Sequence, residues 1–180
     1  MSDGSGPGIQ SRRATILGWL VAVTFAVLFF NIIEMPRTAL DQRESLHAWH
    51  FSLGLVVSIL AGLRIYWWFT EPKPEPPEGL PERSFGFNRA ILLALLLVFV
   101  VETFIGFAYA WGAGHEIVLF GVHIPDWIAS SEGLRMSMGY FHSSLGFYYM
   151  MLFTIWFFYG CYQRLRFKTS MKRLFPGERV

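Results

Sequence analysis

Four long apolar blocks constrain this 180-residue chain more than any other feature of its sequence. The blocks cover residues 14–33, 47–69, 90–111 and 139–162. Each holds about 20 residues or more, which a helix needs to cross the roughly 30 Å hydrocarbon core of a bilayer. Only helices and closed barrels span a bilayer, because backbone groups find no water there, and the period-two alternation of barrel strands is absent from the sequence. We therefore predict an all-α integral membrane protein, a four-helix bundle.

The composition agrees with this prediction. Hydrophobic residues make up 53% of the chain and charged residues only 16%, which is too apolar for an ordinary soluble domain. Arg12 and Arg13 precede the first block, just as positive residues precede the apolar core within a signal peptide. The apolar run is longer than a signal core, however, and no small-residue cleavage site follows it, so we expect a retained helix. No nucleotide-phosphate loop is present, and we expect no nucleic-acid partner.

The positive residues are distributed unevenly between the loops. If the N-terminus lies inside the cell, twelve Lys and Arg residues fall on the cytoplasmic side and three fall on the other, namely Arg37, Arg43 and Arg135. Cytoplasmic loops of membrane proteins carry such an excess. We therefore predict that both the N-terminus and the C-terminus are cytoplasmic.

The sequence divides into three parts. Residues 1–13 are predicted to form a flexible, glycine-rich tail, and residues 14–163 the transmembrane domain. Residues 164–180 mix basic and apolar side chains, which is typical of a short helix on an anionic inner leaflet. Within the transmembrane domain, the proline-dense residues 71–81 favour an extended connection. The longest loop, residues 112–138, has a length that is often functional.

Two short segments, each reading aromatic-His-x-Ser-Leu-Gly, lie near the starts of the second and fourth blocks. Their histidines are His50 and His142, and their glycines are Gly54 and Gly146. In a helix, residues four positions apart share a face. Imidazole is an axial ligand of haem iron, and glycine lacks the side chain that a flat porphyrin would strike. The motifs therefore predict one haem held between His50 and His142, the alternative being interfacial histidines bonded to backbone or water.

The other three histidines are weaker candidates. His47 lies one turn outward of the first motif, where it could replace the ligand or serve as a partner of a haem propionate or as a proton relay. His115 and His123 are expected in the long loop, either solvated or as a lid or quinone contact above the haem. A zinc or copper site is conceivable from these histidines, but no Cys, Asp or Glu spacing supports one.

Two charged residues are also candidates. Glu102 lies midway along the third block, where an ionisable group is costly and usually functional. It is either a protonatable group beside a quinone pocket or a neutral acid bonded to Asn31 or Thr24. Arg135 in the outer loop is either a partner of a haem propionate, since guanidinium binds carboxylate well, or a plain topological charge.

Together these features resemble the prokaryotic cytochrome b561 family, which includes the superoxide oxidase type. The matching elements are the His50 motif with Arg64 at the far end of its helix, residues 120–125 in the outer loop, His142, and the ending at residues 174–176. The resemblance implies a multi-pass protein of the bacterial inner membrane that binds haem b.

The resemblance also implies one departure from the family pattern. The family usually carries two b haems, and Gly18 and Trp156 stand where the ligands of the inner haem are expected. The implied function is a b-type cytochrome with one haem near the extracytoplasmic face, which exchanges electrons with a quinone such as ubiquinone or with a partner redox protein. The alternatives are a non-catalytic scaffold or accessory subunit of a respiratory or photosynthetic complex, and a superoxide:quinone oxidoreductase.

Overall fold

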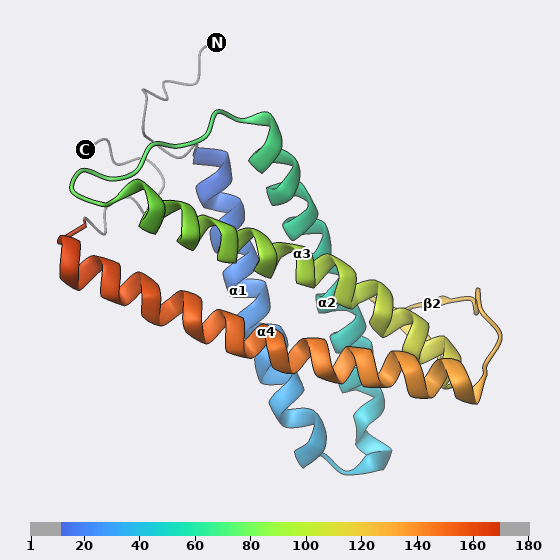
Figure 1. Ribbon diagram of the computed structural model, residues 1–180. Coiled ribbons are helices and arrows are strands. Elements are labelled where there is room, and N and C mark those ends of the chain that lie inside the picture. Colours follow the sequence, from blue (N-terminus) through green and yellow to red (C-terminus); the bar gives the residue numbers. More distant parts are fainter. Residues whose placement is uncertain (1–11, 170–180) are drawn as a thin grey trace.

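The computed structural model describes residues 12–169 and is dominated by four long helices (Figure 1). Within these residues, all four are long and apolar enough to cross a membrane, which confirms the predicted helical membrane bundle. Residues 1–11 of the predicted tail, and the basic segment beyond residue 169, lie outside the described residues. Residues 12 and 13 of that tail are helical and begin α1. The helices are α1 (Arg12–Glu34), α2 (Arg43–Thr70), α3 (Glu82–Gly112) and α4 (Glu132–Phe167).

The helices form two antiparallel pairs. In Figure 1, α1 lies beside α2 and α3 beside α4, and the two pairs cross near the middle of the bundle, where α2 contacts α3. We call the end where α1 and α3 finish and α2 and α4 begin the histidine end. At the opposite end, the Gln163 amide donates to the Ser84 carbonyl at 2.8 Å, and Ser84 Oγ lies 2.7 Å from the Tyr159 hydroxyl. These bonds fix the start of α3 against the end of α4.

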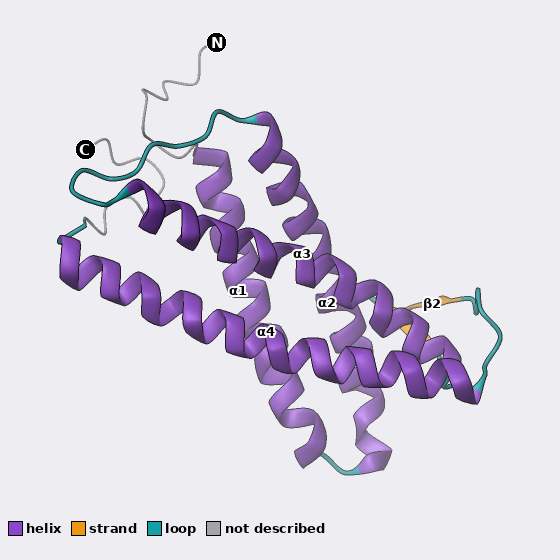
Figure 2. Cartoon of the chain, in the orientation of Figure 1, coloured by secondary structure: helices purple, strands orange, loops and turns teal. Residues whose placement is uncertain are grey.

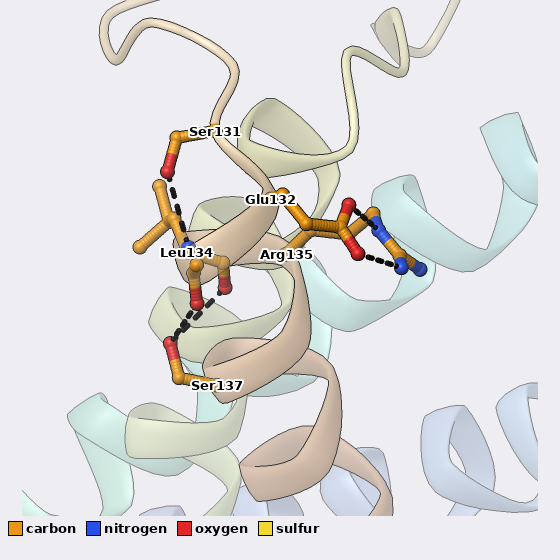
Figure 3. Close-up of polar contacts among 6 residues, drawn as sticks. Ser131, Glu132, Leu134, Arg135 and Ser137 are labelled. Carbon is orange, nitrogen blue, oxygen red and sulfur yellow. Dashed lines mark hydrogen bonds and ion pairs between the residues drawn. The ribbon is translucent and has the colours of Figure 1, made fainter.

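Helix α4 extends beyond its apolar block at both ends, and each end has a cap. Ser131 Oγ accepts a hydrogen bond from the Leu134 N–H at 3.2 Å, which satisfies one of the free donors of the first turn (Figure 3). At the other end, Lys168 adopts the left-handed conformation with φ 52°, as helix C-caps often do. The first residues of the expected surface helix, Arg164 to Phe167, therefore continue α4.

A buried core lies where the pairs cross. Val57 and Ala61 of α2 are at most 1% exposed. The Tyr149 ring of α4 lies 4.6 Å from the Phe99 ring of α3 and 5.1 Å from the Phe25 ring of α1, measured between centroids. Aromatic contacts of this kind add to the packing energy, and they connect α1 to the α3–α4 pair.

The long outer loop contains a small β-hairpin, which the sequence reasoning did not predict (orange strands in Figure 2). Strand β1 (Ile117–Leu119) pairs antiparallel with β2 (Val122–Ile124). The two turn residues, Phe120 and Gly121, both have positive φ, 50° and 83°, as a two-residue hairpin turn of type I′ requires. The Phe120 N–H donates to Ser52 Oγ of α2 at 3.0 Å, so the serine of the first histidine motif anchors the hairpin.

Candidate functional site

A cavity of about 860 Å³ lies between the helices at the histidine end. Residues of all four helices and β1 line it, and its floor includes the core aromatics Phe25, Phe99 and Tyr149. Its volume falls within the range of about 300–1,000 Å³ that is usual for small-molecule and cofactor sites. The lining is mostly apolar, but His50 and His142 both contribute to it.

The structure brings His50 and His142 together across this cavity. Their ring centroids are 6.1 Å apart and their planes are at 89°. An ion bound to one nitrogen of each ring at about 2.0–2.1 Å separates those nitrogens by about 4 Å, and the ring centres lie slightly beyond the nitrogens on both sides. The observed spacing therefore suits two imidazoles that share one metal centre.

Asn31 of α1 holds the His50 ring. Its Nδ2 donates to the Leu46 carbonyl at 3.0 Å, which turns Oδ1 toward His50 Nδ1 at 3.3 Å. With Oδ1 as acceptor, Nδ1 of His50 carries the proton and Nε2 keeps a free lone pair. Asn31 thus contacts a histidine, and it does not make the bond to Glu102 that the sequence reasoning considered.

Glu102 of α3 contacts the second histidine. Its Oε1 lies 3.0 Å from His142 Nδ1, and the two side chains are 18% and 29% exposed. Both Nδ1 of His142 and the other Glu102 oxygen, Oε2, are buried without a hydrogen-bond partner among the described residues. The two side chains are therefore close but are not aligned as a donor and an acceptor. Glu102 is a candidate from its sequence position alone, but its contact with His142 is visible only in the structure.

Two further α3 residues confine the His142 ring. The Tyr109 ring stacks on it at 15° with centroids 6.3 Å apart. A Cβ added at Gly106 would lie 3.1 Å from His142 Cε1, so a larger residue at this position would press the imidazole aside by a few tenths of an ångström. The sequence reasoning missed both residues, because their contact with His142 depends on how α3 is rotated about its axis.

The two motif glycines face the same cavity. A Cβ added at Gly54 would have no heavy atom within 4 Å, and one at Gly146 would meet only Glu102 Oε1, at 3.8 Å. Gly54 therefore leaves open space for a flat group, whereas at Gly146 the Glu102 carboxylate lies beside the wall at an ordinary van der Waals distance. The donor set, the spacing of the rings and these clear walls fit a bis-histidine haem.

At the mouth of the cavity, His47 and His115 lie close together. Their rings are nearly parallel, at 28°, with centroids 6.3 Å apart, and both residues line the cavity. His115 also contacts the Tyr109 ring edge-on at 6.4 Å. Two imidazoles therefore lie at the cavity mouth, where polar groups of a molecule bound in the cavity would reach solvent.

Two sequence candidates lie away from the cavity lining. His123, on β2, is exposed, and its Nδ1 lies 3.4 Å from Glu116 Oε2. Arg135 forms a two-point ion pair with Glu132 on the same helix, with Nε donating to Oε2 at 2.7 Å (Figure 3). In this structure the Arg135 guanidinium is already occupied by a carboxylate of the protein.

The zinc or copper alternative finds no ligand set. Within residues 12–169, no group of three or more His, Cys, Asp or Glu side chains comes together as a site for a metal ion. A haem iron differs from such an ion, because the porphyrin supplies four of its ligands and the protein needs to supply only two. Two facing histidines are therefore sufficient for a haem.

Gly18 and Trp156, which stand where the resemblance places the ligands of an inner haem, have different surroundings. Trp156 packs on Phe153, with ring centroids 6.1 Å apart, and against the buried core. Gly18 of α1 is exposed. Near this end of the bundle, a hollow of only about 20 Å³ lies between Arg64, Trp68 and Arg89, room for about one water molecule.

A comparison with protein families matches residues 9–177, nearly the whole chain, to the family described as prokaryotic cytochrome b561. No curated protein matches the chain.

Proposed function

Because the chain belongs to the prokaryotic cytochrome b561 family, whose members are membrane b-type cytochromes in electron transfer, we propose that it carries electrons through one haem b held by His50 and His142. The observation that carries this proposal is the pair of facing imidazoles, 6.1 Å apart across a cavity. Haem, when bound, supplies the one-electron chemistry of its iron, and axial ligation and the surrounding polarity set its potential.

The chain's own residues bind and orient this group. Asn31 fixes the tautomer of His50, while Tyr109 and Gly106 confine the ring of His142. Gly54 and Gly146 leave the cavity walls clear. The aromatic floor excludes water, which favours electron exchange over side reactions at the metal.

His47 and His115 are the proposed partners of the haem carboxylates at the cavity mouth. Both rings line the cavity there, whereas Arg135 is paired with Glu132. The role of Arg135 as a propionate partner would require that ion pair to open. A proton-relay role for His47 is compatible with the same position.

We propose that the histidine end faces the extracytoplasmic side of a bacterial inner membrane, since the excess of Lys and Arg lies toward the other end. Electrons would then be exchanged at this face with a quinone such as ubiquinone or with a redox partner protein. His123, on the exposed hairpin, is available for contact with either one.

A single haem supports a role that depends on a partner. At the inner end, the hollow between the arginines holds about 20 Å³, and Trp156 packs against the core. One haem near one face does not form a relay across the bilayer. This favours exchange at a single face, or service as an accessory subunit of a respiratory or photosynthetic complex, over superoxide:quinone oxidoreduction.

Removal of each histidine tests the haem site. We expect His50→Ala and His142→Ala to lose the b-type absorption bands of the purified membrane protein, while His123→Ala, on the hairpin outside the cavity, retains them. Gel filtration in detergent shows whether each variant is still folded. A full haem complement in either folded ligand variant would overturn the assignment.

A further inference from the structure

Two arginines line a small hollow at the end of the bundle opposite the histidine end. Arg64 comes from α2 and Arg89 from α3, and both guanidiniums lie by the ring of Trp68, with Cζ 5.6 Å and 3.9 Å from the ring centroid. We propose that this hollow binds a phosphate group, supplied by the headgroup of an anionic phospholipid. The inference does not depend on the haem site, which lies at the other end.

The Arg64 side chain is buried, unlike most arginines near the end of a transmembrane helix. Such arginines usually extend along the helix until the charged group is hydrated, but Arg64 is only 4% exposed. Within residues 12–169, its guanidinium forms no hydrogen bond and no ion pair. A buried charge that is neither paired nor hydrogen-bonded is costly, so an anion bound at the hollow would stabilise this side chain.

The Arg89 guanidinium is held in place, but its donors are unused. Its Cζ lies over the ring of Trp68, which is a cation–π contact. A guanidinium carries five N–H groups, and none of those of Arg89 donates a hydrogen bond within the described part of the chain. Two guanidinium forks therefore line one hollow, and such forks bind phosphate oxygens two at a time.

The charge of the lining favours an anion. Glu71, the residue after α2, also lines the hollow, together with Pro72 and Pro74 of the connection to α3, and the remaining lining residues besides the two arginines are uncharged. One carboxylate against two guanidiniums leaves one positive charge in excess. The volume of about 20 Å³ admits one atom of the size of a water molecule. That is enough for one phosphate oxygen, while the rest of the group stays outside.

The depth of the hollow favours a lipid as the source of the phosphate. Arg64 lies roughly 9 Å before the end of α2, and Trp67 and Trp68 come between it and that end. Tryptophans gather where a bilayer meets water, which is the level of the lipid headgroups. Basic pockets between transmembrane helices on the cytoplasmic side bind anionic headgroups.

Binding of phosphatidylglycerol to the purified full-length protein tests this inference. Native mass spectrometry in detergent counts the bound lipid, with phosphatidylcholine as the comparison. Arg64→Met and Arg89→Met remove the charge and keep a long side chain, and we expect each to weaken phosphatidylglycerol binding about 10-fold or more. Arg83→Met is the matched control, because it removes the same charge from the same end of α3 at an exposed position outside the hollow. It should bind phosphatidylglycerol as the wild type does.

Inorganic phosphate distinguishes a lipid headgroup from free phosphate. The wild-type protein and Arg89→Met are heated in detergent with millimolar phosphate or with chloride at equal ionic strength. Stabilisation by phosphate that Arg89→Met loses, without any preference for phosphatidylglycerol, would keep the phosphate site and overturn the lipid as its source.

The proposal as a whole is overturned by either of two results. One is a wild-type protein that prefers neither phosphatidylglycerol to phosphatidylcholine nor phosphate to chloride; this measurement needs no variant, so it stands even if Arg64→Met does not fold. The other is an equal loss of phosphatidylglycerol binding in Arg83→Met and in the two hollow variants. A wild-type protein without haem would overturn the proposed function and leave this inference intact.

Discussion

The imidazole rings of His50 and His142 stand perpendicular to each other, at 89°. The orientation is fixed from two sides, since Asn31 holds one ring, and Tyr109 stacks on the other. Perpendicular axial ligands donate into different iron d orbitals of π symmetry, whereas parallel ligands donate into the same one. The two orbitals then stay close in energy, and this small energy difference changes the electron paramagnetic resonance signal of the oxidised protein.

The first prediction concerns this electron paramagnetic resonance signal. We expect the oxidised protein to show a highly anisotropic low-spin ferric signal in frozen-solution electron paramagnetic resonance. An ordinary rhombic low-spin signal would mean that the two rings lie nearly parallel in the loaded protein. That result would contradict the ring geometry described here.

The second prediction concerns Gly106. In Gly106→Ala, the new Cβ lies 3.1 Å from His142 Cε1 and forces the imidazole to shift. We expect about a 10-fold or greater loss of haem affinity, the size typical of a disturbed ligand support. The rate of haem transfer to apomyoglobin measures this loss.

Gly18→Ala is the matched control for Gly106→Ala. An added Cβ at Gly18 has no heavy atom within 4 Å, and alanine favours helix over glycine by about 1 kcal/mol. We expect Gly18→Ala to hold haem as the wild type does. Equal haem retention in the two variants would show that Gly106 has no steric role.

The third prediction concerns Gly54, which faces open space in the cavity. An added Cβ has no heavy atom within 4 Å and the residue lines the cavity, so we expect Gly54→Leu to fold normally and to compete with haem for the cavity. We expect a normal gel-filtration profile with a strongly reduced haem-to-protein ratio. Gly18→Leu serves as the control and should keep its haem; an undiminished ratio in Gly54→Leu would place the bound group elsewhere.

The fourth prediction concerns Asn31. Asn31→Leu keeps a side chain of similar size but leaves Nδ1 of His50 without its acceptor, and we expect haem affinity to fall about 10–100-fold. Asn88 is a suitable control, because its Nδ2 bonds Gln163 at 3.4 Å at the opposite end of the bundle. Asn88→Leu should change thermal stability and not haem affinity, and the reverse pattern would contradict the role of Asn31.

The helices and the histidine pair could be predicted from sequence, because both are encoded locally. An apolar block of about 20 residues has few other solutions in a membrane protein. The repeated motif gives His50 and His142 the same depth, since α2 and α4 run in the same direction. Neither argument needs any knowledge of how one helix is rotated against another.

The partners of the histidines do depend on that rotation. The α3 sequence is apolar nearly all around, so no face of the helix indicated that Glu102, Gly106 and Tyr109 point toward α4. Asn31 offered a signal, as a polar residue within the apolar first block, but its partner could not be read from α1 alone. For all four residues, the packing of one helix against another determines which histidine the side chain or backbone contacts.

Two features of the outer loop had local signals that were not used. Glu132 and Arg135 are three residues apart, a spacing that favours an ion pair on a helix, and in this pair Arg135 contacts Glu132, where the sequence allowed either a haem propionate or no partner. Gly121 lies between two short apolar runs, Ile117–Leu119 and Val122–Ile124, which is a hairpin signal. Both features follow from helix and turn rules and needed no tertiary information.

The haem-to-protein ratio of the purified wild-type protein tests the central claim most directly. A reduced-minus-oxidised spectrum identifies the b-type haem, and a pyridine haemochrome assay against the protein concentration counts it. We predict one haem b per chain. Two haems per chain would contradict the claim that Gly18 and Trp156 mark a missing inner site, and a protein without haem would contradict the cytochrome proposal itself.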